Sequence, residues 1–172
     1  LDEKDIDRSV ERILRIVCKA EEPADRTGKQ KFIETADFEK HHKLARKIAE
    51  QGAVLLKNED HILPLRTDDI VLIGSMAEQM RYQGGGSSHV NPTRQMNLTD
   101  VMPGAAYVPC CDREGNVTEE ALREAAKAAS RYKIAVVVAG LPDVYESEAL
   151  DREHMRLPEG HNRMIERAAK AN

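Results

Sequence analysis

The stretch KIAVVVAGL, Lys133 to Leu141, decides the fold. It is a continuous apolar run rich in Val, which is typical of a parallel strand covered on both faces. DIVLIGS, Asp69 to Ser75, has the same character, and AAYVPC, Ala105 to Cys110, predicts a shorter strand. VLLKN, Val54 to Asn58, also predicts a short buried strand.

Segments with helical periodicity alternate with these runs. Asp37 can cap a helix that ends near Gly52, and Thr118 can cap another that runs to Ser130. A last helix begins near Pro158. This alternation predicts an α/β fold, a three-layer α/β/α sandwich with a mostly parallel sheet, flavodoxin-like and partial.

The N-terminal part of the chain is expected to lie outside that sandwich. Residues 5–19 carry the apolar stripe of an amphipathic helix, and residues 20–36 mix Pro, Gly and charges as a linker does. We therefore expect a helix over 1–19, a linker over 20–36 and a C-terminally truncated sandwich over 37–172. An exposed apolar stripe and an unpaired sheet edge would favour self-association of such a fragment.

Composition excludes several classes of partner. The formal net charge of -4 gives no basic field for nucleic acid. No run approaches the roughly 20 apolar residues of a membrane span. The three cysteines are an odd number without zinc-type spacing, so a disulfide framework is not expected and a reducing, cytoplasmic location is favoured. The histidines lack the short spacing of a metal site. Neither a metal nor an organic cofactor is expected.

Two loops are expected to share one edge of the sheet. In open parallel sheets, ligands bind beyond the carboxyl ends of the strands. One such loop follows Ser75 and contains QGGGSSH, Gln83 to His89; the other follows Leu141 and contains YESEALDR, Tyr145 to Arg152. The glycines do not fit a phosphate loop, because no Lys-Ser or Lys-Thr follows them and they do not directly follow the strand.

The acidic loop has two interpretations from its residues alone. Its carboxylates can be solvated loop charges, which exposed acidic runs usually are. Alternatively, a glutamate near the strand end, partly shielded by Tyr145, could have a raised pKa and act as a general acid.

Four segments, in order, resemble glycoside hydrolase family 3, the β-glucosidase and β-xylosidase family. They are HHKLARKIAEQGAVLLKNEDHILPL, IVLIGSMA, YQGGGSSHVNP and VVVAGLPDVYESEALDREHMRLPEGHNRMIERAAKAN. The resemblance is to the family's second domain, an α/β sandwich. LDEKDIDRSVERILRIV resembles the last helix of its first domain, a barrel.

The resemblance implies retaining hydrolysis of terminal β-linked sugars in a glucoside or short oligosaccharide. Members use an Asp nucleophile from the barrel, which this chain lacks, and a Glu general acid/base from the second domain. The family pattern Glu-Gly-x-Asp-Arg places that Glu at Glu148 and puts Ala149 in place of Gly. Glu146 is the alternative. Ala149 puts the loop backbone in question, because Gly reaches positive φ more readily.

The resemblance also implies supporting roles for the neighbouring residues. Asp151 and Arg152 would brace the glutamate. The other wall of the cleft, facing the barrel, would be formed by Gln83, Gly84, Gly85, Gly86, Ser87 and Ser88. The fragment alone would be inactive. The alternative is a non-catalytic α/β module that binds a ligand or a protein.

Overall fold

The computed structural model describes residues 2–21, 36–65 and 68–172. The chain divides into two compact units, Leu1–Asp60 and His61–Asn172, and each is described by itself. The expected linker, residues 20–36, lies almost entirely outside the described residues. The expected division into 1–19, 20–36 and 37–172 remains a prediction.

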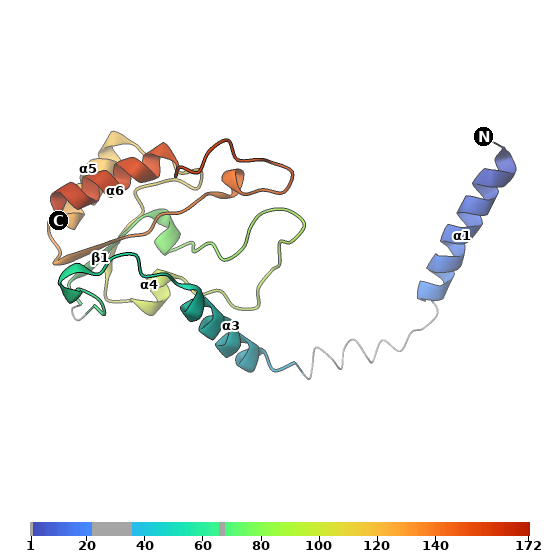
Figure 1. Cartoon of the computed structure of the whole chain (residues 1–172), viewed down its shortest axis with the longest axis horizontal. Coiled ribbons are helices and arrows are strands. Elements are labelled where there is room, and N and C mark those ends of the chain that lie inside the picture. Colours follow the sequence, from blue (N-terminus) through green and yellow to red (C-terminus); the bar gives the residue numbers. More distant parts are fainter. Residues whose placement is uncertain (1, 22–35, 66–67) are drawn as a thin grey trace. The chain divides into compact units, whose positions relative to one another are not determined.

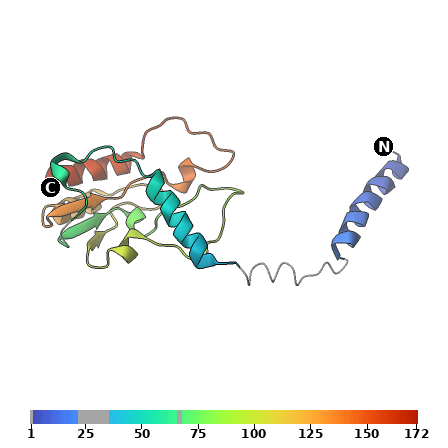
Figure 2. The same cartoon turned by 60° about the horizontal axis from the view of Figure 1, so that its bottom comes forward.

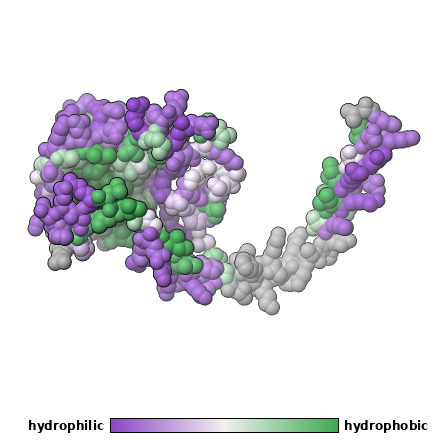
Figure 3. Space-filling view, viewed as in Figure 1, coloured by the Kyte–Doolittle hydropathy of each residue, from purple (hydrophilic) through white to green (hydrophobic). Residues whose placement is uncertain are grey.

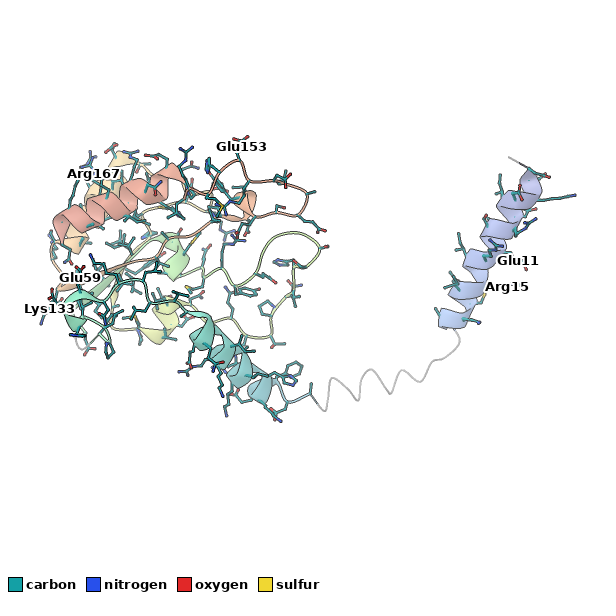
Figure 4. The ribbon with its side chains drawn as sticks, in the orientation of Figure 1. Glu11, Arg15, Glu59, Lys133, Glu153 and Arg167 are labelled. Atoms are coloured by element: carbon teal, nitrogen blue, oxygen red, sulfur yellow. The ribbon has the colours of Figure 1, made fainter. Side chains whose placement is uncertain are left out.

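The first unit contains two helices. Helix α1 (Glu3–Glu21) matches the predicted amphipathic helix. Glu11 and Arg15 lie one turn apart on it and form an ion pair at 2.7 Å (Figure 4). Its apolar stripe is exposed in the described structure, and hydrophobic atoms are visible along the helix in Figure 3. Helix α3 (Phe38–Gly52) begins where Asp37 accepts a hydrogen bond from the Lys40 amide at 2.8 Å.

The strand predicted for VLLKN is not formed. Val54, Leu55 and Leu56 have no regular secondary structure and are exposed, Leu56 to 91%. A strand needs a neighbour for its backbone hydrogen bonds, and no described segment pairs with this one. The apolar composition of the segment was therefore an insufficient signal for a strand.

The second unit is built on a parallel sheet. Its strands are β1 (Ile70–Ile73), β2 (Ala106–Val108) and β3 (Ile134–Val137), in the order β2-β1-β3. Leu72 in the central strand pairs with Tyr107 on one side and Val136 on the other. All of β1 is buried, as its continuous apolar run predicts.

The two faces of the sheet are covered differently. Helices α5 (Glu119–Ala129) and α6 (Glu159–Ala171) pack against each other and over one face, burying residues such as Leu122 and Met164 (Figure 1). The other face packs against Leu65 and the short helix α4 (Leu98–Val101). Figure 2 shows the sheet from a second direction. The predicted α/β sandwich with a parallel sheet is confirmed.

Backbone contacts fix the carboxyl edge of the sheet. Gly74 follows β1 and donates to the Val108 carbonyl at 2.9 Å, while Val138 donates to the Ile73 carbonyl at 2.8 Å. Gly74 has φ +112°, and a Cβ there would overlap the Val138 carbonyl oxygen. Only glycine fits this position, from which the loop after β1 leaves beside the one after β3.

No helix in the described parts of the chain is both long and apolar enough to cross a membrane.

Candidate functional site

The loops after β1 and β3 contact each other directly. The first passes through the short helix η2 (Ser75–Ala77) and the glycine run, and the second through η3 (Asp143–Tyr145). The Gly85 amide donates to the Glu146 carbonyl at 3.0 Å. The Ser87 amide donates to Glu148 Oε2 at 2.6 Å. The structure therefore brings both candidate glutamates against the glycine run.

Gly86 is the point of closest approach between the loops. Its φ is +96°, and a Cβ added there would lie 2.7 Å from Glu148 Oε2 and would overlap Glu148 Cβ. A side chain would therefore be strained by the backbone and would displace the glutamate. Gly86 therefore allows the two loops to contact each other.

Glu148 is exposed, and its pKa is lowered by hydrogen bonds from the Ser87 hydroxyl and backbone amide. The pKa of Glu148 is thus shifted in the direction opposite to the one expected for a shielded general acid. The cause is physical, because amide and hydroxyl donors stabilise the ionised carboxylate while the exposed loop removes little water. At neutral pH this carboxylate is ionised.

Ala149 has the backbone conformation that its place in the family pattern implies for glycine. Its φ is +66°, in the left-handed region. A non-glycine residue costs about 1–2 kcal/mol in this conformation. The loop thus keeps its shape with Ala149 in place, at the cost of local strain.

A single cation joins the acidic residues of the second loop to the first. Arg81 Nη1 lies 3.0 Å from Glu146 Oε2, and Arg81 Nε lies 2.9 Å from Asp143 Oδ1. The Nε contact is a charge pair without an aligned hydrogen bond. Arg81 also donates to the carbonyls of Leu141 and Gln83. The carboxylate of Glu146 is therefore engaged by a cation, whereas Glu148 is held by neutral donors.

The Gln83 side chain closes the glycine loop. Its Nε2 donates to the Val90 carbonyl at 2.9 Å, and its Oε1 accepts from the Val90 amide at 2.9 Å. These two bonds hold the ends of segment 84–89 together. Gln83 therefore supports the glycine loop.

Three other predicted residues make no bond to Glu148 in the described structure. Asp151 and Ser88 are exposed. Arg152 is half-buried, and its buried Nε has no hydrogen-bond partner among the described residues. A bracing role for the Asp151–Arg152 pair remains a prediction. Gly84 lies beside the Glu146 carbonyl and carries no positive φ.

Two hollows flank this junction. One, of about 690 Å³, is lined by residues that include Glu78, Tyr82 and Asn97. The other, of about 290 Å³, lies over the end of β3 at Val138 and Gly140. Arg81 and Gln83 line both hollows. The junction therefore borders concave, mixed polar and apolar surface, which suits a small polar ligand.

Comparison with known proteins shows the family of the chain. Residues 53–172 match the model of the glycosyl hydrolase family 3 C-terminal domain. The chain belongs to glycosyl hydrolase family 3.

Individual members of family 3 agree with this. Thermostable β-glucosidase B of Acetivibrio thermocellus is 44% identical over 99% of this chain and 23% of its own length. An exo-α-(1->6)-L-arabinopyranosidase of Bifidobacterium longum is 32% identical over 79% of the chain and 20% of its length. The crystal structure of the Bifidobacterium adolescentis GH3 β-glucosidase superimposes with a TM-score of 0.73 at 30% identity, covering 80% of this chain and 21% of that one. The chain thus spans about a quarter or less of these relatives.

Two further reactive side chains of the family 3 chain, Cys110 and Cys111, follow β2. Cys110 and Cys111 are buried, and Cys111 Sγ contacts Met164 Sδ at 3.5 Å. A hydrogen bond with the neighbouring Cys110 and burial raise the pKa of Cys111. Within the described residues, no group of three His, Cys, Asp or Glu side chains is arranged to hold a metal ion. Glu153, in the segment before α6, points outward (Figure 4).

Sequence reasoning missed Arg81 and Asp143. A signal was present, because Arg81 is the single Lys or Arg between Ser75 and Ser88, opposite a loop rich in carboxylates. Complementary charge on two loops that share a sheet edge predicts an ion pair between them.

Proposed function

We propose that this chain is the acid/base-bearing part of a retaining β-glycosidase of the β-glucosidase type, with Glu148 as the general acid/base. The observation that carries the proposal is the exposed Glu148 carboxylate held at the junction of the loops after β1 and β3. Membership of family 3 and the β-glucosidases among the relatives support it.

The chemistry would proceed in two steps. Glu148 first protonates the glycosidic oxygen, while an Asp in a barrel domain outside this chain attacks the anomeric carbon and the bond to the leaving group breaks. Glu148 then takes a proton from water, which attacks the same carbon and releases the Asp. The two carboxyl groups would need to lie about 5–5.5 Å apart. Without that partner, the chain is expected to be inactive.

Glu148 needs the partner domain before it can act as a general acid, because its pKa is lowered in this chain. A general acid must hold a proton at working pH, yet Ser87 stabilises the ionised form. Burial against a barrel and a second carboxylate nearby would both raise the pKa. We infer that assembly with the barrel converts Glu148 from a carboxylate into an acid.

The surrounding residues have supporting roles in this proposal. The wall from Gln83 to Ser88 would border the substrate, a β-glucoside or short oligosaccharide. Tyr145, Asp151 and Arg152 would shape the loop around Glu148. The three cysteines are free thiols in the structure, which is in keeping with a reducing, cytoplasmic location.

Replacing each glutamate in the whole protein tests the assignment. Glu148→Gln should lower kcat about 100-fold or more on aryl β-glucosides with poor leaving groups, since loss of acid/base catalysis costs this much. Substrates with good leaving groups should show a smaller loss in the first step. Glu146→Gln tests the alternative assignment two residues away, and its loss of kcat on the same substrates should be smaller than that of Glu148→Gln.

The second candidate is a non-catalytic binding module. The ionised, hydrogen-bonded state of Glu148 favours it, because such a carboxylate suits binding better than proton donation. Unchanged turnover of the Glu148→Gln protein would select this alternative.

A further inference from the structure

Arg81 contacts both loops at the junction and has no part in the chemistry proposed above. Its side chain is only 20% exposed. It contacts four oxygens: the carboxylates of Asp143 and Glu146 and the carbonyls of Leu141 and Gln83. The carbonyl of Gln83 belongs to the loop after β1, and the other three oxygens belong to the segment after β3.

These contacts lie close, in both loops, to the contact between Ser87 and Glu148. Glu146 lies two residues before it, and the Glu146 carbonyl accepts from the Gly85 amide at 3.0 Å. Gly85 lies two residues before Ser87, the donor to Glu148. Arg81 therefore holds the two segments that carry Ser87 and Glu148, through Gln83 in one loop and Glu146 in the other.

The contact set requires a guanidinium. Its three nitrogens take separate oxygens in a planar fork, which a single ammonium cannot reproduce. Removing the cation would also leave Asp143 and Glu146 close together without a counter-charge. Their repulsion would open the loop on the side away from the glycine run.

We propose that Arg81 is a positioning residue, which ties the loop after β1 to the loop after β3 and so holds Glu148 against the glycine run. The kinetic part of this inference rests on the proposed function, and the structural part does not. Arg81 would act on Glu148 through Glu146 and Gly85.

Amide hydrogen exchange on the 172-residue chain tests the structural part. In Arg81→Met, the amides of Gly85 and Ser87 should lose protection, while Val138, bonded to Ile73 in the sheet, should keep it. The pKa of Glu148 should return toward its usual 4.5 as the Ser87 bonds are lost. Arg156→Met, which removes an exposed arginine from the segment before α6, should change neither.

A conservative variant covers the case in which Arg81→Met does not fold. Arg81→Lys keeps the charge, yet it should loosen the same two amides because it cannot span four oxygens. Unchanged protection of Gly85 and Ser87 in the folded variant overturns the inference.

Kinetics of the whole protein test the consequence. Arg81→Lys should lower kcat about 100-fold on poor leaving groups, the cost of a misplaced catalytic group, with KM nearly unchanged. A normal kcat for this variant beside an impaired Glu148→Gln overturns the inference. A normal kcat for Glu148→Gln overturns the proposed function itself, and the exchange of the two amides still decides whether Arg81 holds the loops together.

Discussion

Ser87 and Glu148 are 61 residues apart in the chain, and the Ser87 amide donates to Glu148 Oε2 at 2.6 Å. This bond joins the loops after two neighbouring parallel strands. It also lowers the pKa of the one carboxylate that both the family pattern and the sheet edge select. The position of Glu148 thus depends on both loops, and a substitution in either loop should change the position and the pKa of this carboxylate.

Gly86→Ala should disconnect Glu148 from Ser87. The new Cβ would overlap Glu148 and would need a positive φ. The pKa of Glu148 should then rise toward its usual 4.5, because the donors that stabilise the carboxylate are lost. Carbon-13 NMR titration of the Glu148 carboxyl group measures this.

Gly84→Ala is the matched control for that substitution. Its Cβ would lie 3.8 Å from the Glu146 carbonyl, an ordinary contact, and Gly84 has no positive φ. The titration of Glu148 should stay at its wild-type value. Equal shifts in the two variants would show that the loop responds to any added methyl group.

Ala149→Gly should stabilise the chain by up to about 1 kcal/mol, because glycine relieves the left-handed strain. The greater freedom of glycine in the unfolded chain offsets part of this gain. Urea unfolding measures the change. Ala126→Gly in the middle of α5 is the opposite control and should cost about 1 kcal/mol. A loss of stability in Ala149→Gly would contradict the strain at this residue.

Much of the second unit could be predicted from the sequence. Continuous apolar runs identified β1 and β3, because strands covered on both faces have no polar side. Thr118 caps α5 by accepting from the Ala121 amide at 3.1 Å, as its place before the periodic segment predicts. Such local rules depend only on neighbours in the chain.

What could not be predicted depends on distant partners. VLLKN has the composition of a strand, but pairing requires a second strand at its side. The direction of the shift in the Glu148 pKa depends on hydrogen bonds from Ser87 in the other loop. Gly86 allows that loop to come close enough to Glu148 for these bonds to form. Arg81 was missed because an isolated arginine in a loop carries no periodic pattern, although its charge was complementary to the acidic loop.

His161 should make stability depend on pH. It is 1% exposed at the start of α6, and burial lowers its pKa below the usual 6.5. The unfolded chain therefore binds a proton at a higher pH than the folded chain does. The free energy of unfolding should fall as pH drops below 6.5 and through the lowered folded pKa.

Urea titrations at several pH values check this dependence. His161→Gln should flatten the slope just below pH 6.5, whereas His154→Gln, at an exposed position, should retain it. A wild-type slope in the His161 variant would assign the dependence to other groups.

The exposed stripe of α1 should make the chain self-associate. Ile6 is 52% exposed and Ile13 62%, and such apolar area favours contact between copies. Sedimentation velocity should show dimers or larger species whose fraction rises with concentration. Ile6→Lys with Ile13→Lys should shift the distribution toward monomer, and Glu11→Lys, on the opposite face of the helix, should not. A wild-type chain that stays monomeric at high concentration would contradict this expectation.

The most direct test of the account is azide rescue of Glu148→Gln in the whole protein, with an aryl β-glucoside that has a good leaving group. Such a substrate needs little acid assistance, so the glycosyl-enzyme forms and then waits for a base to activate water. Azide needs no proton removed, so it should raise turnover about 10-fold or more and give a β-glycosyl azide. Absence of rescue in Glu148→Gln, or rescue of Glu146→Gln in its place, would contradict the assignment of Glu148 as the acid/base.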